Sequence, residues 1–514
     1  MKKFEKQQSI TYTAIIVVII GLMGKVFGFL RELLLAKYFG TSRIVDIYLM
    51  SITIPSILFG FLPALGVGFT PTYYSVKTEE RNKFLNNILS VSIVIAIICI
   101  FFMSIFADNI IDIVANGFDN ASQSQTKQFL MITMWSVLFN TPIQILAAYL
   151  NCKGSYISSN IANLTISLIQ AMFVVIAAQI NISLLAYGYL LPFIVQFLWL
   201  LGSAYKREFR PRPTLKFGQN IKKIIILVIP IFISNMLVDL NGFVDKYLGA
   251  SLPEGRISAL NYAFTLRSVF YTVCTTVVTT IFYPKISELT SKKKDNELSS
   301  VVIKVIDIFL LDFIPLQEFS IIFSQDIIKV VLMRGNFSQG SVELTAYPFV
   351  MYMLSLFFIS ITDLIVKIFY AKGDSIHNLL YGAINIGMNI IISICLVNFL
   401  EHTGLALGTT LSSIVTFPLY LRRLSKDVRG IKLKPSFIKA AKIVIASVLV
   451  GIFLIISTKY INLILGNYNI IILTVRLLVQ FVCATIIYVI LLKIFKVKEA
   501  NYLQAFLVSQ YVNL

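Results

Sequence analysis

Three positively charged side chains lie inside segments that are otherwise apolar. Lys25 stands in a glycine-containing run, Arg31 follows less than two helical turns later, and Arg267 lies in the long apolar segment 257–287. A charge at the bilayer centre costs about 2.5–3.5 kcal/mol on insertion scales, so it usually faces a partner or a water-filled cavity. Cations there can donate charge-assisted hydrogen bonds to a diphosphate, and a planar guanidinium fits two phosphate oxygens at once. These residues therefore predict an anion-binding cavity at the membrane midplane.

Each of these cations also has a packing explanation. Lys25 could pair with a neighbouring acid such as Asp46, and Arg31 with Glu32 could mark the outer membrane interface. Arg267 could pair with an acid inside the bundle. The positions alone leave both explanations open, because a buried cation can be satisfied in either way.

Oxygen-bearing side chains form a second candidate site. Asp239 lies in the apolar segment 222–246, and Asn385 and Asn389 lie one helical turn apart in the segment 376–399. A carboxylate with amide oxygens is a hard-oxygen set that suits Na⁺ or H⁺. Ordinary interhelical hydrogen bonding is the alternative. No cofactor is expected beyond such an ion and the membrane potential.

Several further polar residues lie in apolar segments. Asp363 and Lys367 have the spacing of an ion pair on one helix. Asp307, Asp312 and Glu318 have no partner that spacing reveals. The five cysteines stand singly, which indicates neither a disulfide framework nor a zinc site.

The elements that must position these residues are membrane-spanning helices. Of the 514 residues, 57% are hydrophobic and only 13% are charged, which excludes an ordinary soluble domain. Windows of about 20 residues indicate about fourteen spans in an all-α polytopic membrane protein. Their approximate limits are 10–36, 45–74, 85–114, 128–151, 156–179, 182–204, 222–246, 257–287, 299–323, 342–370, 376–399, 403–422, 437–458 and 468–494.

Lysines and arginines collect in alternate loops between these spans. They crowd the segments 206–223, 292–294 and 422–442, whereas the loops 180–183 and 400–403 contain none. This pattern predicts cytoplasmic N- and C-termini, with an uncleaved first span. The net charge of +19 therefore reflects orientation in a membrane and does not indicate binding to nucleic acid.

Short landmarks recur between the two halves of the chain. The matched residues are Pro71 and Pro284, Gly154 and Gly373, and Asn163 and Asn389, at separations of 213, 219 and 226 residues. Landmarks on spans of the same direction predict two parallel six-helix lobes related by a pseudo-twofold axis along the membrane normal, followed by two additional helices. The expected domains are an N-terminal lobe (1–205), a basic cytoplasmic linker (206–223), a C-terminal lobe (224–425), and helices 13 and 14 with the tail (426–514).

Sequence stretches spread over the first twelve spans carry a family resemblance. They are Lys25–Glu32 with Tyr38–Gly40 and Asp46, Ile54–Pro55, Asn116–Phe118, Ala259–Ala263, Arg334–Phe337 and Phe369–Asp374. In order and spacing they resemble the MurJ/MviN lipid II flippase family, part of the superfamily of multidrug and oligosaccharidyl-lipid exporters.

The resemblance implies a V-shaped pair of lobes and a cationic cavity for a diphosphate and its sugar. It also implies a groove beside helices 13 and 14 for a polyprenyl tail. Lys25 and Arg31 match two cavity cations of the family, and Asp46 matches a nearby acid. Asp239, Asn385 and Asn389 match the sodium site of some members, with Asn389 in place of an acid.

Two departures from the family pattern concern the cavity. Phe59 stands where the family usually has an arginine after the proline of helix 2. On helix 8, Thr265 occupies the usual arginine position and Arg267 lies two residues further on. The head group could therefore belong to lipid II or to a capsular, teichoic or other undecaprenyl-diphosphate-linked glycan.

Three classes of function compete on this evidence. A flippase working by alternating access needs cavity cations, whereas a multidrug or cation antiporter needs cavity acids and normally stops at twelve spans. A membrane enzyme needs a general base or metal ligands on a sizeable outer loop, but His377 and His402 are the only histidines and the outer loops are short. The expectation is a flippase of peptidoglycan biosynthesis and not an enzyme, monomeric in the bacterial plasma membrane. Its expected partners are the lipid-linked glycan, membrane lipids and cell-wall or polysaccharide synthesis proteins.

Overall fold

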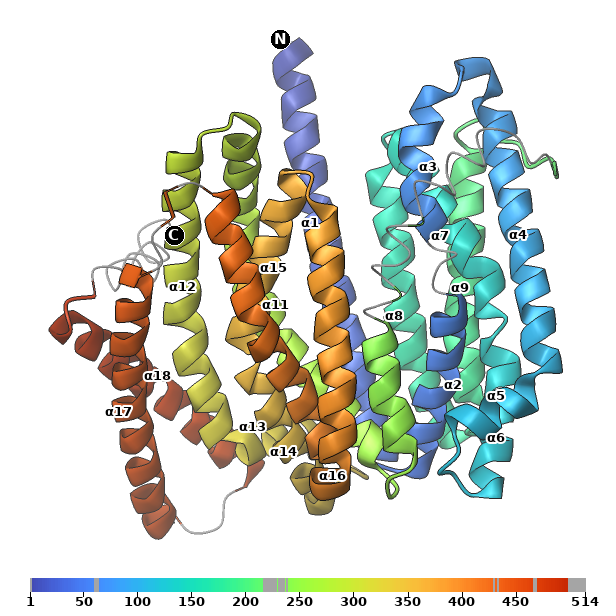
Figure 1. Cartoon of the computed structure of the whole chain (residues 1–514). Coiled ribbons are helices and arrows are strands. Elements are labelled where there is room, and N and C mark those ends of the chain that lie inside the picture. The colour runs from blue at the N-terminus through green and yellow to red at the C-terminus, as the bar shows by residue number, and fades with distance from the viewer. Residues whose placement is uncertain are drawn as a thin grey trace. The chain divides into compact units, whose positions relative to one another are not determined.

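The computed structural model is helical throughout the part of the chain that it describes, with no strand there (Figure 1). It describes residues 2–59, 64–215, 229, 236, 239–428, 430–431, 434–465 and 469–497. Seven of the described helices are long and apolar enough to cross a membrane, or nine if each of two bent pairs counts as one span. The all-α membrane architecture is confirmed, and the total of fourteen spans stays a prediction.

The chain divides into two compact units. The first comprises Met1–Ser258 and Arg334–Phe337, and the second comprises Ala259–Met333 and Ser338–Leu514. The first contains α1 (Lys2–Phe39), α2 (Arg43–Phe59), α3 (Ala64–Ser75), the short turn η1 (Thr78–Glu80), α4 (Arg81–Ile105), α5 (Ala107–Val114), α6 (Asn120–Thr133), α7 (Ser136–Cys152), α8 (Tyr156–Gln179), α9 (Leu184–Tyr205) and a helix over residues 239–250. The second contains most of α11 (Arg256–Ser291), then α12 (Asp295–Ile322), α13 (Ser324–Leu332), α14 (Gln339–Leu354), α15 (Leu356–Ala371), α16 (Ser375–Asp427), α17 (Lys434–Leu465) and α18 (Ile470–Ile494). The predicted domain limits are not tested by this division.

The same turn follows α7 in the first unit and α15 in the second. Each turn contains a glycine with positive φ, Gly154 at 74° and Gly373 at 77°, a conformation that glycine adopts without steric cost. The next residue donates its backbone N–H to the carbonyl five residues earlier, at 2.8 Å from Ser155 and 2.9 Å from Asp374. These residues lie 219 apart, so the predicted landmark has one backbone geometry in both units. The pseudo-twofold axis stays a prediction.

The N-termini of α6 and α14 share this separation. The side chain of Asp119 accepts the backbone N–H of Ser122 at 3.3 Å, and the side chain of Ser338 accepts that of Ser341 at 3.3 Å. Both are N-caps, which satisfy a backbone donor that the helix itself leaves free. The separation of 219 residues therefore recurs at the starts of the helices that precede these turns.

The helix α16 contains two of the predicted spans. Glu401 has φ 48° and ψ −137° within it, which is not helical. The break falls between the spans predicted at 376–399 and 403–422. It divides the 53-residue element into two lengths, each sufficient to cross a bilayer.

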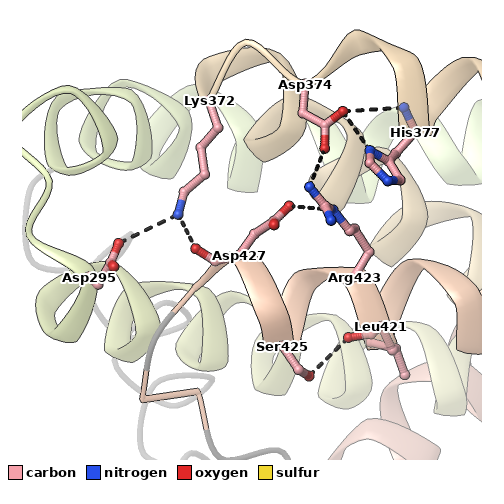
Figure 2. Close-up of polar contacts among 8 residues, drawn as sticks. All are labelled: Asp295, Lys372, Asp374, His377, Leu421, Arg423, Ser425 and Asp427. Atoms are coloured by element: carbon pink, nitrogen blue, oxygen red, sulfur yellow. Dashed lines mark hydrogen bonds and ion pairs between the residues drawn. The ribbon is translucent and has the colours of Figure 1, made fainter.

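A charged cluster joins three segments at one end of the second unit (Figure 2). Lys372 lies 3.5 Å from Asp295 and also donates to the backbone carbonyl of Asp427. Arg423 lies 2.9 Å from Asp374 and 3.1 Å from the carboxylate of Asp427. The cluster therefore ties the start of α12 and the turn before α16 to the end of α16.

Replacing Asp374 with serine should lower the melting temperature of the purified protein. Burial acts to raise the pKa of this carboxyl, but hydrogen bonds from His377 and Arg423 outweigh burial and hold the pKa below its usual range. Its stabilising contribution is present at neutral pH and is lost as pH falls through that lowered pKa. The expected cost at neutral pH is about 1–3 kcal/mol, read from thermal unfolding in detergent.

Ser155 provides the matched control, because it occupies the same turn position in the first unit. Its side chain makes no hydrogen bond with other described residues. Ser155→Ala should therefore leave the melting temperature within the small range of ordinary surface changes. Equal melting temperatures for Asp374→Ser and the unchanged protein would show that the cluster contributes nothing.

Candidate functional site

The candidate site of the first unit lies along the packed pair α1 and α8 (Figure 1). The position of Gly28 faces Ser167, and Arg31 bonds to Gln170, so the two helices run in the same direction. Residues on α1 therefore meet residues on α8 in the same order. Lys25 and Arg31 occupy successive levels of this seam.

A cavity of about 240 Å³ opens beside Lys25. Its lining residues are Ile20, Gly21, Gly24, Lys25, Asn160, Asn163, Leu164 and Ser167. A side chain at Gly21 or Gly24 would meet no atom within 4 Å. Gly21 and Gly24 therefore border open space, and they keep the cavity clear on the side of α1.

The polar lining of the cavity presents donors rather than acids. Lys25 is exposed and makes no hydrogen bond or ion pair with the described residues. Asn163 accepts a hydrogen bond from Gln196 at 2.7 Å through its carbonyl oxygen, which leaves its NH₂ group to donate elsewhere. An ammonium and an amide N–H are groups that bind an anion.

The side chain of Arg31 is partly buried and hydrogen-bonded within the first unit. It donates to Gln170 at 2.7 Å and to the carboxylate of Glu32, which is only 5% exposed. Its Nε has no partner in the described part of the chain. Tyr48 and Tyr189 lie close enough to interact with it electrostatically. The pair therefore belongs to a partly buried polar network of the first unit, and its position relative to the membrane interface stays a prediction.

Asp46 has a different environment from the one expected of a substrate ligand. It is fully buried and accepts the backbone N–H groups of Gly255 and Ser258, each at 2.8 Å. Arg43 lies 3.9 Å away. The pairing with Lys25 considered from sequence is not formed. Asp46 holds the residues that begin α11 against α2, and its assignment to substrate binding stays a prediction.

Arg267 is buried in the second unit among aromatic rings. Its guanidinium lies 4.7 Å from the ring centre of Phe264 and 5.9 Å from that of Tyr352, a cation–π arrangement. It donates to Ser355 at 3.4 Å. No acid within the described ranges forms an ion pair with it. Convergence of Arg267 with Lys25 and Arg31 on one cavity stays a prediction.

The residues of the candidate cation site belong to different units. Asp239 is exposed in the first unit. In the second unit, Asn385 donates to Thr416 at 3.0 Å and Asn389 donates to Thr409 at 3.1 Å. The buried Oδ1 of Asn389 has no partner among the described residues. Each asparagine thus makes the interhelical hydrogen bond of the alternative explanation, and the cation site stays a prediction.

The structure gives an ion-pair partner to one of the three acids that spacing left unexplained. Asp307 pairs with Lys439 of α17 at 2.6 Å. The carboxylate of Glu318 lies against α17 beside Gly451, with Oε1 2.1 Å from where a Cβ would stand. Asp312 lies between them on α12. The ion pair predicted for Asp363 and Lys367 is confirmed at 2.8 Å.

Sequence reasoning missed one buried arginine. Arg476 on α18 is 7% exposed, pairs with Asp326 of α13 and donates to Asn462 of α17 at 2.8 Å. Its signal was the same as that of Arg267, a cation within an apolar run. These contacts join α18 to α13 and α17 within the second unit.

Known structures share this fold. A structure described as lipid II flippase MurJ in an inward closed conformation matches with a TM-score of 0.80 and 22% sequence identity, covering 94% of this chain and 98% of that one. An inward-facing multidrug resistance MATE family transporter of the MOP superfamily matches with a TM-score of 0.65 and 13% identity, covering 80% and 98%. These likenesses and the apolar helices define a multi-span helical membrane protein with the fold of this transporter superfamily.

Sequence comparison identifies the family. The chain belongs to the family described as lipid II flippase MurJ, whose model matches residues 35–478. A probable lipid II flippase MurJ of Rickettsia prowazekii (strain Madrid E) is 24% identical over 416 residues, covering 78% of this chain and 81% of the relative. One from Thermotoga maritima is 24% identical over 435 residues, covering 83% and 86%. The family resemblance is confirmed, and Asp46 and Arg267 lie within the matched residues whereas Lys25 and Arg31 precede them.

Proposed function

We propose that this chain moves lipid II, an undecaprenyl-diphosphate-linked saccharide, from the cytoplasmic to the outer leaflet by alternating access. Membership of a family of transporters supports transport rather than catalysis. The observation that carries the proposal is the ammonium of Lys25, which has no partner among the described residues and borders a cavity of about 240 Å³.

The chemistry of the cavity suits a phosphate group better than a cationic drug. Lys25 supplies three N–H donors and Asn163 an amide donor, while the lining contains no carboxylate. A multidrug or cation antiporter needs acids at this position. The donors of the α1–α8 seam therefore favour an anionic head group.

The remaining parts of the lipid have matching surfaces. The helices α17 and α18 expose apolar side chains that include Val448, Ile452, Val475 and Val479. A polyprenyl tail would stay against such a surface while the head group crosses. The membrane potential would act on the charged head group, because one charge moved through 100 mV corresponds to about 2.3 kcal/mol. Coupling to Na⁺ or H⁺ is part of the same proposal.

Lys25→Ala should weaken transport by roughly tenfold to a hundredfold, because it removes a charge-assisted hydrogen bond of about 1.5–3 kcal/mol. Growth rescue of a flippase-depleted strain measures the loss, with protein level checked by immunoblot. Lys127→Ala is the control, since Lys127 forms a surface ion pair with Asp108 and should leave rescue unchanged. Full rescue by Lys25→Ala would show that the ammonium beside the cavity is not needed for transport, which contradicts head-group binding there.

The mass of lipid that co-purifies with the protein tests the head group directly. Lipid II is the expected species. Co-purification of a capsular or teichoic precursor would support flippase activity toward a substrate other than lipid II. Absence of any diphosphate lipid would contradict the proposed function.

A further inference from the structure

Lys246 adds a second cation to the polar network that Arg31 and Glu32 form in the first unit. It lies on the helix over residues 239–250, and its ammonium donates to the hydroxyl of Thr53 on α2. Glu32 and Asp245 are close enough to interact with it electrostatically. Because Glu32 also accepts a hydrogen bond from Arg31, both cations interact with the same buried acid.

The direction of this side chain is unusual for a lysine near a helix end. Lys246 lies four residues before the last residue of its helix, Ala250. The loop that follows lies at the start of α2, where Glu254 accepts the backbone N–H of Arg43 at 2.8 Å. Thr53 is ten residues beyond Arg43, about 15 Å along α2 at 1.5 Å per residue. Lysines usually extend toward the nearer interface, but this one extends inward.

The inward position leaves part of the ammonium unused. An ammonium has three N–H donors, and the hydroxyl of Thr53 is its hydrogen-bond partner among the described residues. That partner is neutral, and within the part of the chain that the structure describes the charge is compensated only by the electrostatic interaction with Glu32 and Asp245. A cation held inside a membrane bundle usually faces a partner or a wet cavity, and here two donors remain for a ligand.

We propose that Lys246 is a further head-group residue that donates to the diphosphate, in addition to Arg31 and Lys25. This inference rests on the proposed function and deepens it. Thr53 is a positioning residue, because its hydroxyl holds the ammonium at depth on α2. The ligand is a diphosphate rather than a sugar because three cations from two helices suit a group with more than one negative charge.

Binding of two lipids that differ by one phosphate tests the assignment. The wild-type protein in nanodiscs is titrated with undecaprenyl diphosphate and with undecaprenyl monophosphate. Lys246→Gln should weaken diphosphate binding at least tenfold and monophosphate binding much less, Lys246→Arg should retain most of the affinity, and Thr53→Val should cause a smaller loss. Lys127→Gln serves as the matched control at the surface.

Each outcome decides the proposal. Unchanged diphosphate affinity in Lys246→Gln, or an equal loss for both lipids, would assign Lys246 to packing and overturn it. If Lys246→Gln cannot be purified, Thr53→Val supplies the comparison, and an unchanged diphosphate affinity or an equal loss for both lipids in Thr53→Val would overturn the proposal. A wild-type protein that binds neither lipid would contradict the proposed function itself, a result distinct from failure of the Lys246 assignment alone.

Discussion

Arg31→Ala is expected to abolish growth rescue in a flippase-depleted strain. The substitution removes the guanidinium that bonds to Gln170 and Glu32 and interacts with Tyr48 and Tyr189. It removes a proposed ligand of the diphosphate and leaves the buried carboxylate of Glu32 with one cation fewer. Breaking a buried pair in this way costs about 3–5 kcal/mol. This free energy corresponds to a change of more than a hundredfold in an equilibrium constant.

A second variant separates the loss of binding from a loss of folding. In Arg31→Ala combined with Glu32→Gln, the buried acid is neutral and the protein should again accumulate to the wild-type level. It should still fail to rescue growth, because the guanidinium remains absent. Rescue by the double variant would show that Arg31 serves only to neutralise Glu32.

Asp46→Ala is expected to cause the largest loss of stability. The carboxylate is fully buried and accepts two backbone N–H groups from Gly255 and Ser258 at 2.8 Å. Each donor left without a partner costs about 1–3 kcal/mol. The melting temperature and the amount of protein in the membrane should both fall, and Asp46→Asn should lie between alanine and wild type because one carbonyl oxygen remains.

Asp112→Ala provides the control for this change, since Asp112 is an exposed acid on α5. Its melting temperature should equal that of the wild type. The Asp46 variants also discriminate between the two roles of this residue. If Asp46→Asn has wild-type stability but no longer binds the diphosphate, Asp46 acts in substrate binding. That result would contradict the anchoring role.

The sequence predicted features that follow from local patterns. Apolar runs long enough to cross a bilayer predicted the all-α membrane fold, and the glycines of the turns after α7 and α15 marked the repeat because only glycine readily takes their positive φ. A cation within an apolar run drew attention to Arg31, and the cavity role predicted for it stays a prediction. Each of these signals is a local sequence pattern, so it can be read without knowledge of contacts between distant segments.

Contacts between distant segments could not be predicted in this way. Asp46 meets backbone groups more than two hundred residues later, and backbone acceptors and donors carry no sequence signature. Lys246 was not predicted as a buried cation because a lysine close to a span end normally marks the interface. Its inward direction depends on Thr53 of another helix. The partners of Arg267, which are rings rather than an acid, were likewise set by packing.

Transport by the purified protein in liposomes tests the central claim most directly. Lipid II carrying a fluorophore on its head group is incorporated into both leaflets, and a membrane-impermeant reductant then bleaches the outer leaflet. We expect wild-type protein to expose the inner-leaflet lipid to bleaching and the Arg31→Ala, Glu32→Gln double variant not to expose it. Identical protection of the inner-leaflet pool in liposomes with wild-type protein and in protein-free liposomes would contradict it.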